Sequence, residues 1–217
     1  MAYLWTPPAE LVQKSNLSAF LRATGQPDYD VLAVTADADP AWLVQEVFKF
    51  CDVRFYRQPG TILDLVRGEP WARWCVGGTT NIVLNCIDKH RGTEVWHAPF
   101  LVWEGEDKRE QRRLTYAEFA SDVGRLASGL RKLGIGKGDV VAIYMPNLPE
   151  TFVAFFATLK IGAIVMPLFS GFGPDPIRSR LNHGEAKAVI TANGTWRRGA
   201  PAPLKSVLDE ALQAAPS

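Results

Sequence analysis

The chain has 217 residues, which suggests one full domain, or one domain with an extension, and allows a sizeable hydrophobic core. Hydrophobic residues make up 47% and charged residues 22%, a composition that is typical of globular proteins and excludes a disordered or fibrous chain. The net charge of +1 gives no general electrostatic reason to expect nucleic acid or an anionic membrane as a partner.

The cysteines and the amino terminus bear on where the protein functions. Cys51, Cys75 and Cys86 are odd in number and share no close metal-ligand spacing. They are typical of reduced, mostly buried thiols, so we expect a cytoplasmic protein. Residues 1–8 contain neither the basic nor the apolar segment of a signal peptide, and none is expected.

Residues 1–76 are rich in tryptophan and proline and contain only short helical patterns. The clearest helix is predicted at residues 40–50, where a proline in the first turn follows Asp39. Residues 58–60 are predicted to form a turn. The whole region is predicted to be an extension wrapped on a larger body, without an independent core.

The next segment combines a helix with a hairpin. Residues 79–90 have apolar side chains at helical spacing, and residues 99–105 are typical of a strand. Residues 113–114 are predicted to return as its partner, with residues 104–112 as a solvated tip. The charges at this tip are of mixed sign, which favours a solvated turn over a nucleic-acid patch.

A long helix is predicted to begin after Thr115. Thr115 and Glu118 have the spacing of a capping box, in which the hydroxyl and the carboxylate bond free backbone amides. Residues 134–138 read Gly-Ile-Gly-Lys-Gly and are predicted to end the helix, since they are too short and too poor in hydroxyls for a phosphate loop. Apolar side chains recur along the helix with a period near 3.6, at Phe119, Val123, Leu126, Leu130 and Leu133.

From Asp139 onward the patterns alternate between strand and helix. Strands are predicted at residues 139–146, 160–169 and 187–191, which indicates a parallel sheet. Ligands of such sheets bind beyond the carboxyl ends of the strands. Arg197 follows the third strand, where a phosphate is expected. The predicted fold class is therefore α/β, with an N-terminal helical extension followed by part of a parallel α/β sheet layer.

One apolar stretch, residues 151–169, is nearly long enough to cross a membrane. Lys160, Gly162 and Pro167 interrupt it, whereas a membrane span needs an unbroken run of about 20 apolar residues. A buried helix–strand unit is therefore favoured, and no membrane span is predicted.

Taken in order, these patterns resemble the beginning of an AMP-forming acyl-CoA synthetase, closest to the acetyl-CoA synthetase branch of the adenylate-forming enzymes. Residues 1–76 resemble the family's N-terminal extension more loosely, and residues 77–217 resemble the first part of its AMP-binding domain. The matching segments are residues 81–90, 101–105, 114–118, 133–146, 160–163, 169–172, 186–191 and 203–205.

The resemblance implies an acid–CoA ligase that uses ATP with Mg²⁺ and coenzyme A (CoA) and acts on acetate or another short-chain acid. Such an enzyme needs a hydroxyl-rich phosphate loop, an acid for magnesium and a mobile C-terminal lysine. None of these is found in the 217 residues, so we expect about the first third of such an enzyme, inactive by itself. The sequence predicts no catalytic residue and no metal ligand, because His90, His97 and His183 are scattered.

The resemblance implies that this chain contains part of a CoA site. The family's basic tetrad, which contacts the 3′-phosphate end of CoA, matches residues Arg197, Arg198, Gly199 and Ala200. The first arginine is retained, whereas an alanine takes the last basic position. Without the resemblance, a solvated basic turn would be the preferred interpretation of the two arginines.

A second stretch completes the predicted site. Phe169, Ser170 and Gly171 match the segment whose backbone borders the adenine, with Ser170 in place of a usual glycine. Small-molecule substrates are therefore the expected partners, together with possible self-association through an exposed sheet edge. The alternative function is a non-catalytic module with the same partial fold that binds a nucleotide or a partner protein.

Overall fold

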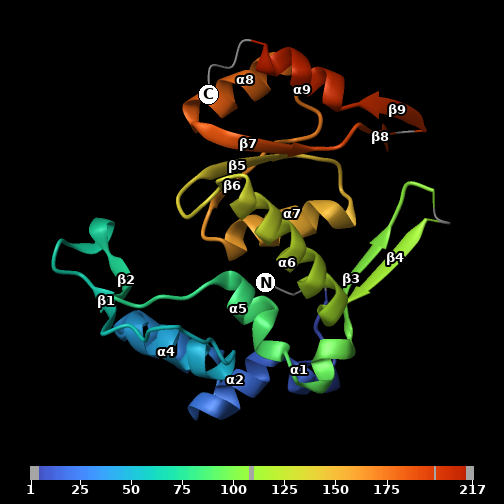
Figure 1. Cartoon of the computed structure of the whole chain (residues 1–217). Coiled ribbons are helices and arrows are strands. Elements are labelled where there is room, and N and C mark those ends of the chain that lie inside the picture. Colours follow the sequence, from blue (N-terminus) through green and yellow to red (C-terminus); the bar gives the residue numbers. More distant parts are fainter. Residues whose placement is uncertain (1–4, 108–109, 198, 214–217) are drawn as a thin grey trace. The chain divides into compact units, whose positions relative to one another are not determined.

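The computed structural model describes residues 5–107, 110–197 and 199–213. The chain divides into two compact units between Thr80 and Asn81, and Figure 1 labels their helices and strands.

In the first unit, short helices precede a small hairpin. The Asp28 and Asp39 side chains accept hydrogen bonds from the first turns of the third and fourth helices and thereby cap them. The ring of the buried Phe20 packs edge-on against Phe50 at 5.3 Å between centroids. The elements are α1 (Ala9–Lys14), α2 (Asn16–Thr24), α3 (Tyr29–Ala38), α4 (Pro40–Phe50), β1 (Thr61–Asp64), η1 (Glu69–Trp71) and β2 (Arg73–Val76).

The helix predicted at residues 40–50 is confirmed by α4. The antiparallel pair of β1 and β2 was not predicted, because each strand has four residues and a proline-containing turn of η1 lies between them. Alternation over so few residues gives too weak a strand pattern to recognise.

The second unit begins with a short helix, two turns and the predicted hairpin. Strands β3 and β4 pair antiparallel, and their last pair is Glu104 opposite Gln111. The elements are α5 (Ile82–Cys86), η2 (Asp88–His90), η3 (Glu94–His97), β3 (Pro99–Glu104) and β4 (Gln111–Thr115).

Helix α6 (Tyr116–Lys132) begins with the predicted capping box. Thr115 Oγ1 accepts from the Glu118 backbone N–H at 3.2 Å, and the Glu118 carboxylate accepts from the Thr115 N–H at 2.8 Å. The bond from the Thr115 N–H, and a second one from the Thr115 hydroxyl at 2.9 Å, hold the pKa of the Glu118 carboxyl below its usual value. Of the predicted apolar stripe, Phe119, Val123 and Leu130 are buried and Leu126 is partly buried, but Leu133 is 78% exposed because the helix has already ended.

A three-stranded parallel sheet forms the centre of the second unit, in the order β6-β5-β7. Helices α6 and α7 cover one face, and α8 and α9 cover the other (Figure 1). Val141 therefore packs on the first side, whereas Ala142 and Tyr144 pack on the second. The elements are β5 (Val140–Tyr144), α7 (Pro149–Lys160), β6 (Ile164–Pro167), α8 (Pro174–His183) and β7 (Ala186–Thr191).

After the sheet the chain forms a second short hairpin and a final helix. They are β8 (Gly194–Arg197), β9 (Ala200–Pro203) and α9 (Lys205–Leu212). Arg197 follows the third predicted strand, as expected, but it belongs to an antiparallel pair that was not predicted, in which it lies opposite Ala200. The prolines at 201 and 203 hide this strand from a sequence pattern.

The apolar stretch at residues 151–169 forms α7 and β6. Among the described residues, no helix is long and apolar enough to cross a membrane.

Strand β6 is an edge of the described sheet, and Ile164 on it is 52% exposed. We expect the polypeptide to self-associate through this edge, because an unpaired strand with an exposed apolar side chain can pair with another chain. Ile164→Lys should shift the association midpoint to several-fold higher concentration in sedimentation velocity, whereas Leu133→Lys, which removes an exposed leucine at the end of α6, should not. A wild-type monomer at all concentrations, with no binding of a hydrophobic dye, would contradict this expectation.

Candidate functional site

A cleft of about 470 Å³ opens in the second unit at the carboxyl ends of β5 and β6. Asn147 and Leu148 follow β5, and Phe169 and Ser170 follow β6. Strand β8 and the tip of the β3–β4 hairpin supply the other walls. The cleft therefore lies where ligands of parallel sheets bind.

Tyr144, at the end of β5, holds the loop after β6 through its hydroxyl group. Its hydroxyl donates to the Phe172 carbonyl at 3.0 Å and lies 3.4 Å from the Ser170 carbonyl. Tyr144 is buried, and this burial raises its pKa, so the hydroxyl stays protonated and remains a donor. Phe169 and Ser170 are thus held on a loop that a buried side chain positions.

Arg197 and Phe169 meet at this cleft. The Arg197 guanidinium lies 5.6 Å from the centroid of the Phe169 ring. Gly171 permits the approach, since a Cβ atom there would be 2.5 Å from Phe169 Cε1 and 2.9 Å from Arg197 Nη1. The structure therefore brings together three of the residues that the sequence predicted for the site.

Of the remaining predicted residues, Gly199 lies in the turn after β8 and Ala200 begins β9. Gly199 has a φ of +74°, and its N–H donates to the carboxylate of Glu106 at 3.0 Å. Ala200 is exposed, and its methyl group offers no charge to a ligand. Arg198 lies outside the described residues.

The sequence did not predict the contribution of the β3–β4 hairpin. Trp103 Nε1 donates to the Asn147 carbonyl at 2.6 Å and fastens the hairpin to the loop after β5. Glu104, Glu106 and Glu110 line the cleft, although a hairpin tip was expected to be merely solvated. Their distance along the chain from β8 hides this role, because no local motif records a contact between residues 93 positions apart.

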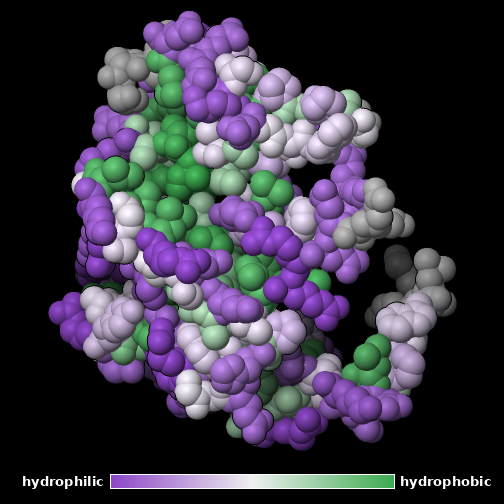
Figure 2. All heavy atoms as spheres, turned by 45° about the vertical axis from the view of Figure 1, so that its right-hand side comes forward, coloured by the Kyte–Doolittle hydropathy of each residue, from purple (hydrophilic) through white to green (hydrophobic). Residues whose placement is uncertain are grey.

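The described lining is aromatic and mainly acidic. Trp103, Trp196 and Phe169 supply ring surface, and the charged side chains of the lining are three glutamates and Arg197. Trp196 and Phe169 are 65% and 58% exposed. Figure 2 shows apolar side chains reaching the surface among hydrophilic ones in the upper half of its view. The aromatic side chains of this lining can stack on a planar ring, and the Arg197 guanidinium can bind an anionic group.

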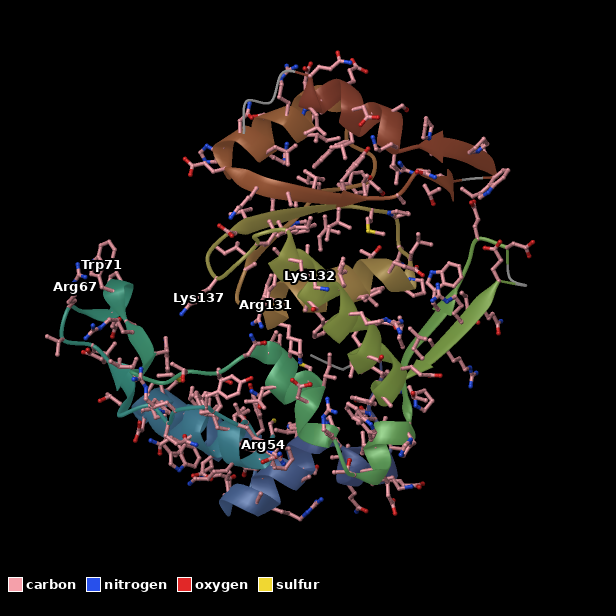
Figure 3. The ribbon with its side chains drawn as sticks, in the orientation of Figure 1. Arg54, Arg67, Trp71, Arg131, Lys132 and Lys137 are labelled. Carbon is pink, nitrogen blue, oxygen red and sulfur yellow. The ribbon has the colours of Figure 1, made fainter. Side chains whose placement is uncertain are left out.

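Other basic residues lie away from the cleft. Arg131 and Lys132 occupy the last turn of α6, and Lys137 precedes β5 (Figure 3). They are therefore at the amino end of the strand, opposite to the cleft, where positive charge complements the helix dipole. No group of three or more potential metal ligands from His, Cys, Asp and Glu is found within the described ranges.

Comparison with known proteins identifies the family. A family model described as AMP-binding enzyme matches residues 89–216, more than half of the chain. The chain belongs to this family. The AMP-binding family model begins within η2 and includes every residue of the cleft described above.

Relatives place this AMP-binding chain more closely. An acetyl-coenzyme A synthetase of Rhodopirellula baltica is 38% identical over 221 residues, which cover 99% of this chain and 31% of that protein. A Mycobacterium tuberculosis acetyl-coenzyme A synthetase is 41% identical over 151 residues, covering 69% and 23%. The chain thus spans about a third or less of the curated relatives that it matches.

A solved structure agrees with these relatives. The acetoacetyl-CoA synthetase from Streptomyces lividans superposes with a TM-score of 0.88 at 26% identity, over 98% of this chain and 33% of that protein. The predicted α/β fold and the resemblance to the acetyl-CoA synthetase branch of the AMP-forming synthetases are both confirmed.

Proposed function

We propose that this chain is part of an acid–CoA ligase that converts an acid, ATP and CoA into acyl-CoA, AMP and diphosphate. The observation that carries the proposal is the match of 99% of the chain to an acetyl-coenzyme A synthetase at 38% identity. Acetate or another short-chain acid is the proposed substrate, with Mg²⁺ accompanying ATP. We infer a cytoplasmic enzyme, since no disulfide joins its cysteines in the described part of the chain.

We infer further that the cleft holds part of CoA. In this proposal the Arg197 guanidinium, which lines the cleft, binds the 3′-phosphate, and the amide of Gly199, two residues further along the chain, is a second donor. The loop from Phe169 to Gly171 borders the adenine. The position of Arg197 over Phe169 supports the proposal. The guanidinium that would bind the phosphate lies beside the loop that would border the adenine. Ala200 adds no charge, so the phosphate contact depends on the arginines before it, and Arg198 enters on the sequence match alone.

The test is made on the protein encoded by the whole reading frame that contains these residues. We expect its sequence to include a hydroxyl-rich phosphate loop and a late lysine. The purified protein should catalyse acid-dependent exchange between ATP and diphosphate, and it should form a CoA thioester with acetate, propionate or acetoacetate. A panel of acids of increasing length would identify the substrate by the highest kcat/KM.

The contrary result is also specific. A reading frame that lacks the phosphate loop, and a protein that binds nucleotide without exchange for any acid, would overturn the ligase proposal. Those two results together would favour the non-catalytic nucleotide-binding module.

A further inference from the structure

The hydrogen bond between Gly199 and Glu106 joins the turn after β8 to the β3–β4 hairpin, and both β8 and the hairpin line the cleft. Gly199 lies in the β8–β9 turn, two positions after Arg197, and Glu106 lies on the β3–β4 hairpin. The Gly199 N–H donates to Glu106 Oε1 at 3.0 Å. Both ends of this bond are exposed, so a ligand from solvent can compete for it.

In this contact Glu106 binds the Gly199 amide as an anionic ligand would, because a carboxylate oxygen accepts the hydrogen bond. A phosphate is bound by guanidinium groups and backbone amides acting together, and Arg197 and Gly199 supply one of each. In this structure the Gly199 amide donates instead to a carboxylate oxygen of Glu106. A phosphate that reached the same amide would approach the negative charge of Glu106, and the two like charges would repel each other.

We propose that Glu106 is a specificity-determining residue that competes with the 3′-phosphate of CoA for the Gly199 amide. The inference rests on the CoA site proposed above. Phosphate-bearing ligands must displace the carboxylate before they bind, whereas ligands without that phosphate leave the contact in place. Glu106 therefore lowers the preference of the site for CoA over dephospho-CoA, which lacks the 3′-phosphate.

Glu106 can release the Gly199 amide without breaking the pairing of the hairpin strands. The pairing of β3 with β4 ends at Glu104 and Gln111, and Glu106 lies beyond this last pair. Trp103 holds the base through its bond to the Asn147 carbonyl. Release of Glu106 consequently costs one exposed hydrogen bond and leaves the strand pairing intact.

The first measurement asks whether the contact exists in solution. In NMR spectra of the 217-residue polypeptide, Glu106→Gln should move the Gly199 amide resonance, because the amide loses a charged acceptor. Glu104→Gln is the matched control. It removes an equal charge from the same cleft, but Glu104 accepts from Gln111 and not from Gly199. An unchanged Gly199 resonance in Glu106→Gln would overturn the proposal.

The second measurement is the affinity of the same variants, made in the protein from the whole reading frame, for CoA and dephospho-CoA by calorimetry. Glu106→Gln should tighten CoA roughly threefold to tenfold and change dephospho-CoA less than about twofold, because one charged competitor is removed from one phosphate contact. Glu104→Gln should leave the ratio of the two affinities near that of wild type.

The outcomes separate this inference from the site on which it rests. If wild type prefers CoA to dephospho-CoA and Glu106→Gln leaves that ratio unchanged, the CoA site stands and the competition is refuted. If neither wild type nor Glu106→Gln distinguishes the two coenzymes, or if neither protein binds them at millimolar concentration, the proposed phosphate site is wrong. The competition is then refuted with it.

Discussion

The polypeptide of these 217 residues is expected to show no acid-dependent exchange between ATP and diphosphate. Formation of an acyl-adenylate places additional negative charge around the α-phosphate, which must be stabilised by fixed donors and cations. The cleft offers one guanidinium from Arg197 against the three glutamates in its described lining. The glycine-rich stretch at residues 134–138 ends α6 and precedes β5, at the opposite end of that strand from the cleft.

The size of the expected loss follows from the number of missing groups. Removal of a single preorganised donor from an oxyanion site costs about a hundredfold to a thousandfold in kcat. Because we expect neither a triphosphate cradle nor the family's late lysine among these residues, exchange should fall to the level of a no-acid control. The protein from the whole reading frame is the positive control. Exchange by the 217-residue polypeptide above the no-acid background would show that these residues contain a complete adenylation site.

Sequence patterns predicted the central elements well because their determinants are local. The capping box at Thr115 and Glu118 sets the start of α6, and the alternation of apolar strands and helices sets the parallel sheet. The hydrophobic period, however, does not show where a helix ends. Leu133 continues the period of α6 but lies at its C-cap, exposed to solvent.

The cleft was predictable only on the side made by the sheet. Phe169 and Arg197 follow or lie near strand ends, so the position of strand ends together with family resemblance was sufficient to propose them. The acidic wall comes from the β3–β4 hairpin, whose contact with Gly199 depends on how the hairpin packs in three dimensions. A charged tip on a hairpin has the same sequence pattern whether it faces water or a binding site, which is why Glu106 was missed.

Arg197→Ala, made in the protein from the whole reading frame, is expected to raise the apparent KM for CoA roughly tenfold to hundredfold. The loss of a charge-assisted phosphate contact at an exposed position corresponds to about 1.5–3 kcal/mol. Acid-dependent exchange of diphosphate should be unchanged, because the guanidinium is proposed to meet only the distal phosphate of the second substrate. Combining this change with Arg198→Ala should give an effect at least as large.

Two comparisons make this result specific to the phosphate. With dephospho-CoA, wild type and Arg197→Ala should differ much less, since this coenzyme has no 3′-phosphate for Arg197 to bind. Arg180→Ala is the matched control. Arg180 lies over Phe172, 4.4 Å from the ring centroid, just as Arg197 lies over Phe169, but it does not line the cleft. Its removal should leave the KM for both coenzymes near that of wild type. If Arg197→Ala also loses exchange, or weakens both coenzymes equally, then Arg197 acts by holding the Phe169 loop and not by binding the phosphate.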